Sequence, residues 1–271
     1  MPEMTLPEKE LPETTPLEAL GETEDVFHRG RFHLIQPALK GHRSGVDAMM
    51  LAACVPHEFN GYVADLGAGA GAAGFAVAAR CEQAQVTLIE RSELMTEFAR
   101  KSMALVVNAS LAPRLSLLNA DVSLTGKKRE EAGLISNYFD FAIMNPPFNS
   151  AADRSTPHVL KAEAHVMPPD MFETWIKTAA AIVKPGGSVA IIARPASLYT
   201  ILTALSARFG AIQIIPIHPR PQAAAIRLIF IGVKGSKAPL SFQPALNLHE
   251  NTGNSFTERA IAINNGLTSL L

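Results

Sequence analysis

The sequence predicts an α/β protein built on one doubly wound, mainly parallel β-sheet. Short apolar runs that read as buried strands alternate with segments of helical periodicity. Carboxylate or amide side chains stand at the ends of four successive runs, which is the edge where such sheets bind ligands. The last two runs, 212–217 and 226–233, are joined by a loop that is too short for a crossover helix. These two strands should therefore be antiparallel.

Length and composition limit the class of protein. The chain has 271 residues, of which 48% are hydrophobic, and this suits one large domain with additions. Its two cysteines, Cys54 and Cys81, lack metal-ligand spacing and favour a reducing compartment. No apolar run approaches the roughly 18 residues of a membrane span, and no signal sequence is evident. We expect a cytoplasmic protein with neither a metal nor a membrane partner, and these features set no oligomeric state.

Charge is distributed unevenly along the chain. Residues 1–25 carry eight acidic side chains against Lys9 alone and predict a disordered acidic leader. Beyond this leader there are 23 basic and 17 acidic residues, a balance compatible with a polyanionic partner. Residues 27–45 alternate apolar and basic side chains, which predicts a hairpin with one basic face. With a helix from Val46, we expect residues 26–60 to cover the functional site.

A glycine-rich loop follows the first predicted strand of the main domain, residues 61–65. Its glycines allow backbone amides to approach a ligand closely, and it opens a helix that ends near Cys81. The pattern Gly-x-Gly-x-x-Gly from Gly69 also matches the dinucleotide-binding fingerprint. Asp65, however, ends the strand immediately before the loop. Its carboxylate would repel a pyrophosphate and suits a cationic or amino-bearing ligand.

Two further acids stand at the ends of the next two strands. Glu90 follows the strand 86–89, a position at which a carboxylate can accept both hydroxyls of a ribose. Asp121 follows the strand 115–118. Since the carboxyl ends of parallel strands meet at one edge, Asp65, Glu90 and Asp121 should share one crevice.

The fourth strand, 139–144, ends in Asn145, Pro146, Pro147 and Phe148. The prolines lack a backbone N–H and stop the strand, and they hold the preceding residue extended. Asn145 then offers a side-chain carbonyl, Pro146 a backbone carbonyl and Phe148 a flat ring. Two acceptors beside a stacking platform fit a planar ligand with an exocyclic NH2 group.

The remaining segments predict supporting structure. The polar stretch after Phe148, with His158, Lys161 and His165, suggests a mobile substrate lid. Lys127-Lys128-Arg129 reads as solvated surface. A helix from Asp170 repeats Phe172, Trp175, Ile176, Ala179, Ile182 and Val183 on one face, which predicts core packing and no cofactor contact. The main domain should span 61–238, and 239–271 reads as an ill-defined tail with a short helix near 258–263.

The ordered set of a glycine loop, three strand-end acids and Asn-Pro-Pro-Phe resembles an S-adenosylmethionine-dependent methyltransferase. The resemblance spans Ser44 to Val233 and implies a seven-stranded Rossmann-like sheet with an antiparallel final hairpin. The block Leu34-Ile35-Gln36-Pro37 with Gly45-Val46-Asp47-Ala48 is similar to the bacterial valine-tRNA adenine-N6 methyltransferase family. That family commonly has tyrosine at the position of Phe148.

The resemblance implies roles for individual residues. S-adenosyl-L-methionine is the implied methyl donor, and tRNA is the implied substrate, methylated at adenine N6. Asn145, Pro146, Pro147 and Phe148 would hold the target amino group. The implied cofactor-binding residues are Asp47, Asp65, Gly67, Ala68, Gly69, Gly71, Glu90, Arg91, Asp121, Val122 and Asn145.

Three alternatives remain open from the sequence. The same acceptor pair suits guanine N2 in RNA or a protein glutamine amide. A nicotinamide-dependent oxidoreductase would use the glycine loop and Glu90, but it explains neither Asp65 nor Asn145. A catalytically silent RNA-binding module would keep the fold and lose affinity for S-adenosylmethionine.

Overall fold

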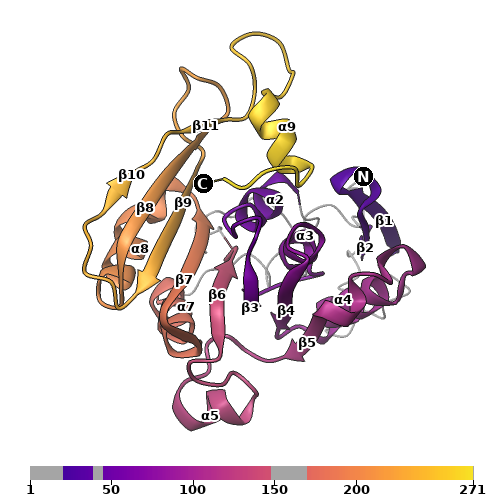
Figure 1. Cartoon of the computed structure of the whole chain (residues 1–271), viewed down its shortest axis with the longest axis vertical. Helices are drawn as coiled ribbons and strands as arrows, with labels where there is room; N and C mark the ends of the chain where they lie inside the picture. Colours follow the sequence, from indigo (N-terminus) through magenta and orange to yellow (C-terminus); the bar gives the residue numbers. More distant parts are fainter. Residues whose placement is uncertain (1–20, 39–44, 148–169, 271) are drawn as a thin grey trace, which may run out of the picture.

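The computed structural model describes residues 21–38, 45–147 and 170–270. Its centre is a nine-stranded sheet with the strand order β10-β8-β9-β7-β6-β3-β4-β5, and β11 pairs beside β8 (Figure 1). The parallel part contains the five strands β3 (Asn60–Leu66), β4 (Gln83–Glu90), β5 (Leu115–Asn119), β6 (Phe139–Met144) and β7 (Val183–Ala193). The α/β fold predicted from the sequence is confirmed.

The final hairpin is antiparallel, as the short joining loop predicts. β9 (Arg227–Lys234) pairs antiparallel with both β7 and β8 (Phe209–His218). β8 therefore runs in the same direction as β7 and ends at the same edge of the sheet. These seven strands form the predicted sheet, and the C-terminal segment extends it.

Helices cover both faces of the sheet and bury two apolar clusters. One cluster lies under α2 (Val46–Ala52), α3 (Ala72–Arg80), α4 (Glu93–Ala104) and α9 (Glu258–Asn264). The other lies under α7 (Met171–Ile182) and α8 (Leu198–Ser206). Short helices complete the connections: η1 (His28–Gly30), η2 (Val106–Asn108), η3 (Ala112–Arg114), α5 (Gly126–Glu131) and η4 (Pro195–Ser197). Helix α4 was not predicted. No helix in these parts of the chain has the length and apolar character that a membrane crossing needs.

The C-terminal segment is more ordered than predicted. The short helix near 258–263 is confirmed as α9. The segment also adds β10 (Ser241–Phe242) and β11 (Leu246–Asn247), both parallel to β8. The amide of Leu270 donates to the carbonyl of Ala53 at 2.7 Å, so the end of the described chain is joined to the residue that follows α2.

The N-terminal hairpin begins earlier than predicted, and its basic face stays a prediction. β1 (Glu22–Phe27) starts inside the segment expected to be a disordered leader, and it pairs with β2 (Phe32–Pro37). Two acidic side chains of β1 have partners in other elements, because Glu24 pairs with His33 and Glu22 with Lys101. The basic residues Lys40, His42 and Arg43 lie outside the described residues.

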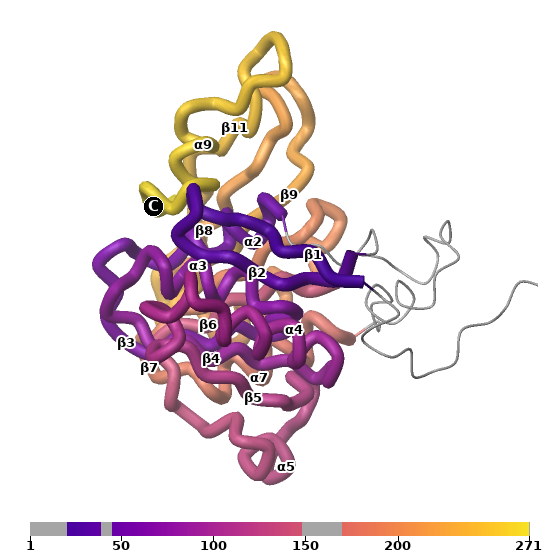
Figure 2. Tube along the Cα trace, turned by 90° about the vertical axis from the view of Figure 1, so that its right-hand side faces the viewer, coloured from indigo at the N-terminus to yellow at the C-terminus, as the bar shows by residue number. Residues whose placement is uncertain are grey.

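Two buried polar side chains dock this hairpin on the domain. Asn108 accepts a hydrogen bond from the His33 amide at 3.0 Å and donates to the His33 carbonyl at 2.7 Å, so it imitates a neighbouring strand. Ser102 on α4 accepts from the Ile35 amide at 2.9 Å. Figure 2 brings the hairpin to the front, where it crosses beside α3 and α4. These side chains therefore pair backbone N–H and C=O groups on the edge of β2 that faces away from β1.

Arg129 corrects the interpretation of the basic triplet as solvated surface. Its side chain is buried, donates to the carbonyl of Leu134 and reaches Ser136 Oγ at 2.7 Å. Lys127 and Lys128 are exposed, as expected. The guanidinium closes the loop after α5, a role that the local pattern of charges does not reveal.

His28, in the turn of the N-terminal hairpin, should make folding pH-dependent. It is 2% exposed, and burial together with the charge of Arg80 lowers its pKa from 6.5 to about 4. The unfolded chain therefore binds the proton of this histidine more tightly between these values, and the stability that His28 contributes falls as the pH drops through this window. This contribution should fall by about 2 kcal/mol between pH 7 and pH 5, measured by urea denaturation as the difference between the wild type and a variant without the histidine, because the raised pKa of buried Asp65 acts in the opposite direction over the same range.

His28→Asn is the matched control for this prediction. The backbone of His28 has φ +47°, and asparagine tolerates such left-handed conformations better than other side chains do. Relative to this variant, the wild type should lose about 2 kcal/mol of stability between pH 7 and pH 5. A difference in stability between the two proteins that stays constant from pH 7 to pH 5 would contradict the prediction.

Candidate active site

The predicted site residues stand at one edge of the sheet, at the carboxyl ends of four neighbouring strands. The strand order places β6, β3, β4 and β5 side by side. Leu66 of β3 pairs with Met144 of β6 and with Ile89 of β4, and Glu90 pairs with Asn119. Gly67 and Asn145 therefore follow paired residues on adjacent strands, about 5 Å apart in strand spacing. The structure brings the glycine loop and Asn145 together.

The glycine loop turns over β4 and is fixed there by its own amides. Gly67 and Ala68 both donate to the carbonyl of Ile89, at 2.9 and 3.0 Å. Gly69 donates to Glu90 Oε2 at 2.9 Å. Gly67, Gly69 and Gly71 all have positive φ, so this path requires residues without a Cβ.

Asp65 lies beneath this loop in an environment that disfavours its charge. The side chain is 2% exposed, and its Oδ2 accepts from the amide of Gly74 at 2.8 Å. Its pKa is raised from 3.8 to about 7: burial is the main cause, the Gly74 hydrogen bond opposes the shift, and the charge of Glu90 adds to it. A cationic group placed beside Asp65 would reverse this shift, because it would stabilise the carboxylate.

Glu90 and Asp121 occupy the next two positions along the edge. The second oxygen of Glu90 accepts from the amide of Ser92 at 2.8 Å, so this carboxylate fixes both the glycine loop and the start of α4. Asp121 accepts from the amide of Ser123 at 2.7 Å and forms a 3.7 Å ion pair with Arg91. Arg91 and Asp121 thus contact each other, and Val122 beside them is buried.

Asn145 has an unusual feature for a residue at a strand end. Its Oδ1 is buried and has no hydrogen-bond partner in the described chain. Buried polar atoms are nearly always paired, so this oxygen is available as an acceptor for a ligand at this edge. Pro146 is buried beside it and Pro147 is half-buried. Phe148 and the predicted lid, with His158, Lys161 and His165, lie outside the described residues.

Asp47 lies on a different part of the edge from the other predicted cofactor residues. Its Oδ2 accepts from Arg227 Nε at 2.8 Å, which joins the first turn of α2 to the start of β9. β9 is separated from β3 by β7 and β6. The structure therefore pairs Asp47 with the terminal hairpin, and a contact with the cofactor stays a prediction.

Two residues at this edge were not predicted to contribute. Asn119 donates to the carbonyls of Glu90 and Arg91 and to Thr96, at 3.1 to 3.3 Å, and so supports the loop that carries Glu90. Trp175 of α7, assigned from the sequence to a core face, reaches the glycine loop at Gly67. Neither contact has a local sequence signal, since both join segments far apart in the chain.

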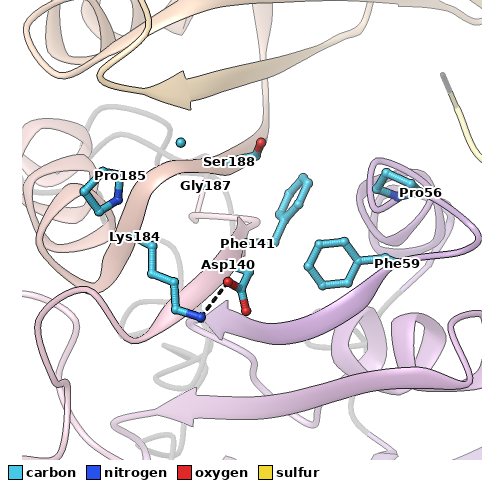
Figure 3. A pocket seen from close by; sticks show the side chains of 9 residues that line it. Pro56, Phe59, Asp140, Phe141, Lys184, Pro185, Gly187 and Ser188 are labelled. Carbon is cyan, nitrogen blue, oxygen red and sulfur yellow. Dashed lines mark hydrogen bonds and ion pairs between the residues drawn. The ribbon is translucent and has the colours of Figure 1, made fainter.

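A pocket at the opposite edge of the sheet has different properties. It has a volume of about 410 Å³ and is lined by Pro56, Phe59, Asp140, Phe141, Lys184, Pro185, Gly186, Gly187 and Ser188 (Figure 3). Asp140 and Lys184 stand near the starts of β6 and β7, and their 2.6 Å ion pair neutralises both charges. The pocket is therefore remote from the strand-end acids, and its two charged side chains pair with each other.

The residues at the carboxyl edge fit S-adenosylmethionine. The glycine loop leaves room for close backbone approach, Glu90 can accept from a ribose, and Asp65 suits an amino group. The sulfonium of that cofactor supplies an electrophilic methyl group. Asn145, one strand away, would then face the atom that receives the methyl group.

Comparisons with known proteins agree with this geometry. The family model of the methyltransferase small domain matches residues 44–218, more than half of the chain. A protein from Agrobacterium tumefaciens, described as a predicted O-methyltransferase, is 44% identical with a TM-score of 0.72, and the match covers 82% of this chain and 97% of that one. No curated protein matches.

More distant structures share the fold alone. A T. thermophilus 16S rRNA N2 G1207 methyltransferase, solved with AdoMet and guanosine, is 19% identical with a TM-score of 0.52, over 79% of this chain and 50% of that one. A type I restriction-modification methyltransferase subunit from Streptococcus thermophilus is 18% identical with a TM-score of 0.54, over 82% and 52%. The chain belongs to the methyltransferase small domain family and is an S-adenosylmethionine-dependent methyltransferase.

Proposed function

We propose that the protein methylates an exocyclic amino group of a nucleic-acid base, with adenine N6 in tRNA as the favoured target. The observation that carries the proposal is the buried, unpaired Oδ1 of Asn145 at the end of β6. It is followed by Pro146, whose carbonyl supplies a second acceptor close by. Two neighbouring acceptors match the two hydrogens of an NH2 group.

The chemistry of an amino group on an aromatic ring explains the need for such acceptors. Its lone pair is delocalised into the ring, so the nitrogen is a weak nucleophile. Hydrogen bonds to Asn145 and Pro146 favour a pyramidal nitrogen and orient its lone pair toward the methyl group. With the cofactor bound, the nitrogen would form a bond to the methyl carbon as the carbon–sulfur bond breaks, the electron pair of that bond would stay on sulfur, and one amino proton would pass to solvent. Alignment supplies most of the acceleration.

An oxygen acceptor fits Asn145 less well, although the 44% identical relative is described as a predicted O-methyltransferase. A hydroxyl group must lose its proton as the methyl arrives, and a carboxamide cannot take that proton. An amino group needs only acceptors until the methyl has transferred. The residue at the strand end therefore favours nitrogen.

Guanine N2 and a protein glutamine amide remain competing substrates, because each presents the same NH2 group. A nucleic-acid base is supported by the surplus of basic residues beyond position 25. A base must leave its stack to reach a strand-end site, which favours a loop or a single strand. Stacking on Phe148 would hold it there and stays a prediction.

The substrate can be identified by transfer of a labelled methyl group. The full chain is incubated with labelled S-adenosylmethionine and separate fractions of RNA, DNA and protein, followed by nucleoside and amino-acid analysis. We expect label in the tRNA fraction as N6-methyladenosine. If the label appears as N2-methylguanosine or methylglutamine, the substrate is guanine or glutamine and adenine is wrong. Label on an oxygen atom would overturn the proposal. Calorimetry with S-adenosylhomocysteine separates a silent binding module, which would show no affinity, from an enzyme tested on the wrong substrate.

A further inference from the structure

Trp175 touches the glycine loop at the residue where the loop leaves the sheet. A Cβ built on Gly67 would lie 2.5 Å from Cη2 and 2.8 Å from Cζ3 of the indole. The far end of the ring therefore occupies the space that a side chain at position 67 would need. Gly67 also has φ +71°, which favours glycine independently. The close contact and the backbone turn occur at the same residue.

The ring contacts the loop in addition to the hydrogen bonds that the loop makes with the sheet. The amides of Gly67 and Ala68 fix the loop to Ile89 of β4. Trp175 belongs to α7, and it packs on the apolar cluster under α7 and α8, on the other face of the sheet from α3 and α4. The loop is therefore held both by β4 and by the indole ring.

The contact between Trp175 and Gly67 lies close to Asn145. Gly67 follows Leu66, which pairs with Met144, and Asn145 follows Met144. A displacement of the loop would move the methyl donor relative to the nitrogen held at Asn145. Misplacement of about 1 Å can cost on the order of 100-fold in rate.

We propose that Trp175 is a positioning residue for methyl transfer. Its indole ring sets the position of the glycine loop, and through the loop it sets the methionine end of S-adenosylmethionine relative to Asn145. This inference rests on the family membership and on the cofactor, and it does not depend on which base or protein is methylated. Cofactor binding can therefore test it without the substrate.

Fluorescence provides the first test, because Trp175 is the single tryptophan of the full chain. The protein is titrated with S-adenosylhomocysteine, and its emission is compared with the heat of binding. We expect an emission change that saturates with the same Kd as the calorimetric signal. Calorimetric saturation without any change in emission would show that the ring does not sense the loop and would overturn the proposal.

Substitutions provide the second test, with a matched control on the same helix. Trp175→Ala should raise the Kd for S-adenosylhomocysteine about tenfold, the equivalent of 1.4 kcal/mol, and Trp175→Phe should restore most of the affinity. Phe172→Leu alters a buried residue in the same cluster away from the loop. It should lower Tm and leave the Kd unchanged. If Trp175→Ala lowers Tm alone, with the Kd within twofold of wild type, Trp175 is merely structural.

A double-mutant cycle isolates the contact itself. Gly67→Ala introduces both the clash with the ring and the strain of a positive φ. In the Trp175→Ala background the clash is absent and only the strain remains. The loss of affinity caused by Gly67→Ala should therefore be smaller there than in the wild type. Equal losses in the two backgrounds would mean that the residues act independently and would contradict the proposal.

Discussion

Asn145→Ala should lower methyl transfer by roughly 10²–10³-fold or more, while the Kd for S-adenosylmethionine stays within about threefold of the wild-type value. The substitution removes the buried acceptor Oδ1, which has no partner in the described chain and is therefore free to bind the target amino group. Without it, the nitrogen loses one of the two hydrogen bonds that orient its lone pair. The cofactor retains the glycine loop, Asp65 and Glu90. Single-turnover rates with labelled cofactor, together with calorimetry, separate the two effects.

Two control variants test whether the effect of Asn145→Ala comes from the lost acceptor oxygen. Asn137→Gly removes an exposed asparagine that precedes β6 at the opposite edge, and it should leave both rate and affinity near wild type. Asn145→Asp keeps the oxygen acceptors and should retain more activity than Asn145→Ala. If Asn145→Ala weakens cofactor binding as much as it lowers the rate, the residue has a structural role, and the proposed contact with the amino group is wrong.

The affinity for S-adenosylmethionine should rise with pH up to about 7 and then level off. Burial raises the pKa of Asp65 to about 7, and the ionised form is the one that suits the cationic amino group of the cofactor. Below pH 7 a proton must leave Asp65 before this contact forms, which costs about 1.4 kcal/mol for each pH unit. We therefore expect the Kd to increase about tenfold per pH unit below 7, or about 100-fold between pH 8 and pH 5.

Calorimetry in buffers with different ionisation enthalpies counts the protons released on binding. Release should be greatest below pH 7 and vanish above pH 8, and circular dichroism confirms that the protein is folded at each pH. Asp65→Asn keeps the size of the side chain and removes the titrating group. The Kd of this variant for S-adenosylmethionine should be higher than that of the wild type at pH 8 and nearly independent of pH. A wild-type Kd that is constant from pH 8 to pH 5 would show that Asp65 does not ionise on binding.

The sequence by itself determined the sheet and the edge at which the site lies. Two of these apolar runs are followed by chain breakers, Gly67 after β3 and Pro146 after β6. These signals are local, because chain breakers and strand-end polar groups act within a few residues. The short loop before β9 likewise required an antiparallel pair. The positions of Asp65, Glu90, Asp121 and Asn145 at one edge follow from the order of elements alone.

Tertiary structure alone decided which partners the charged and aromatic side chains have. Arg129 is buried by the loop after α5, Asp47 pairs with Arg227 across 180 residues of sequence, and Trp175 lies against Gly67. Each of these contacts depends on how separate elements pack, and the local sequence around each residue does not predict it. The acidic composition of β1 likewise predicted disorder, whereas its carboxylates pair with His33 and Lys101 in other elements. Local composition sets where a strand can end, whereas long-range packing sets what each side chain does there.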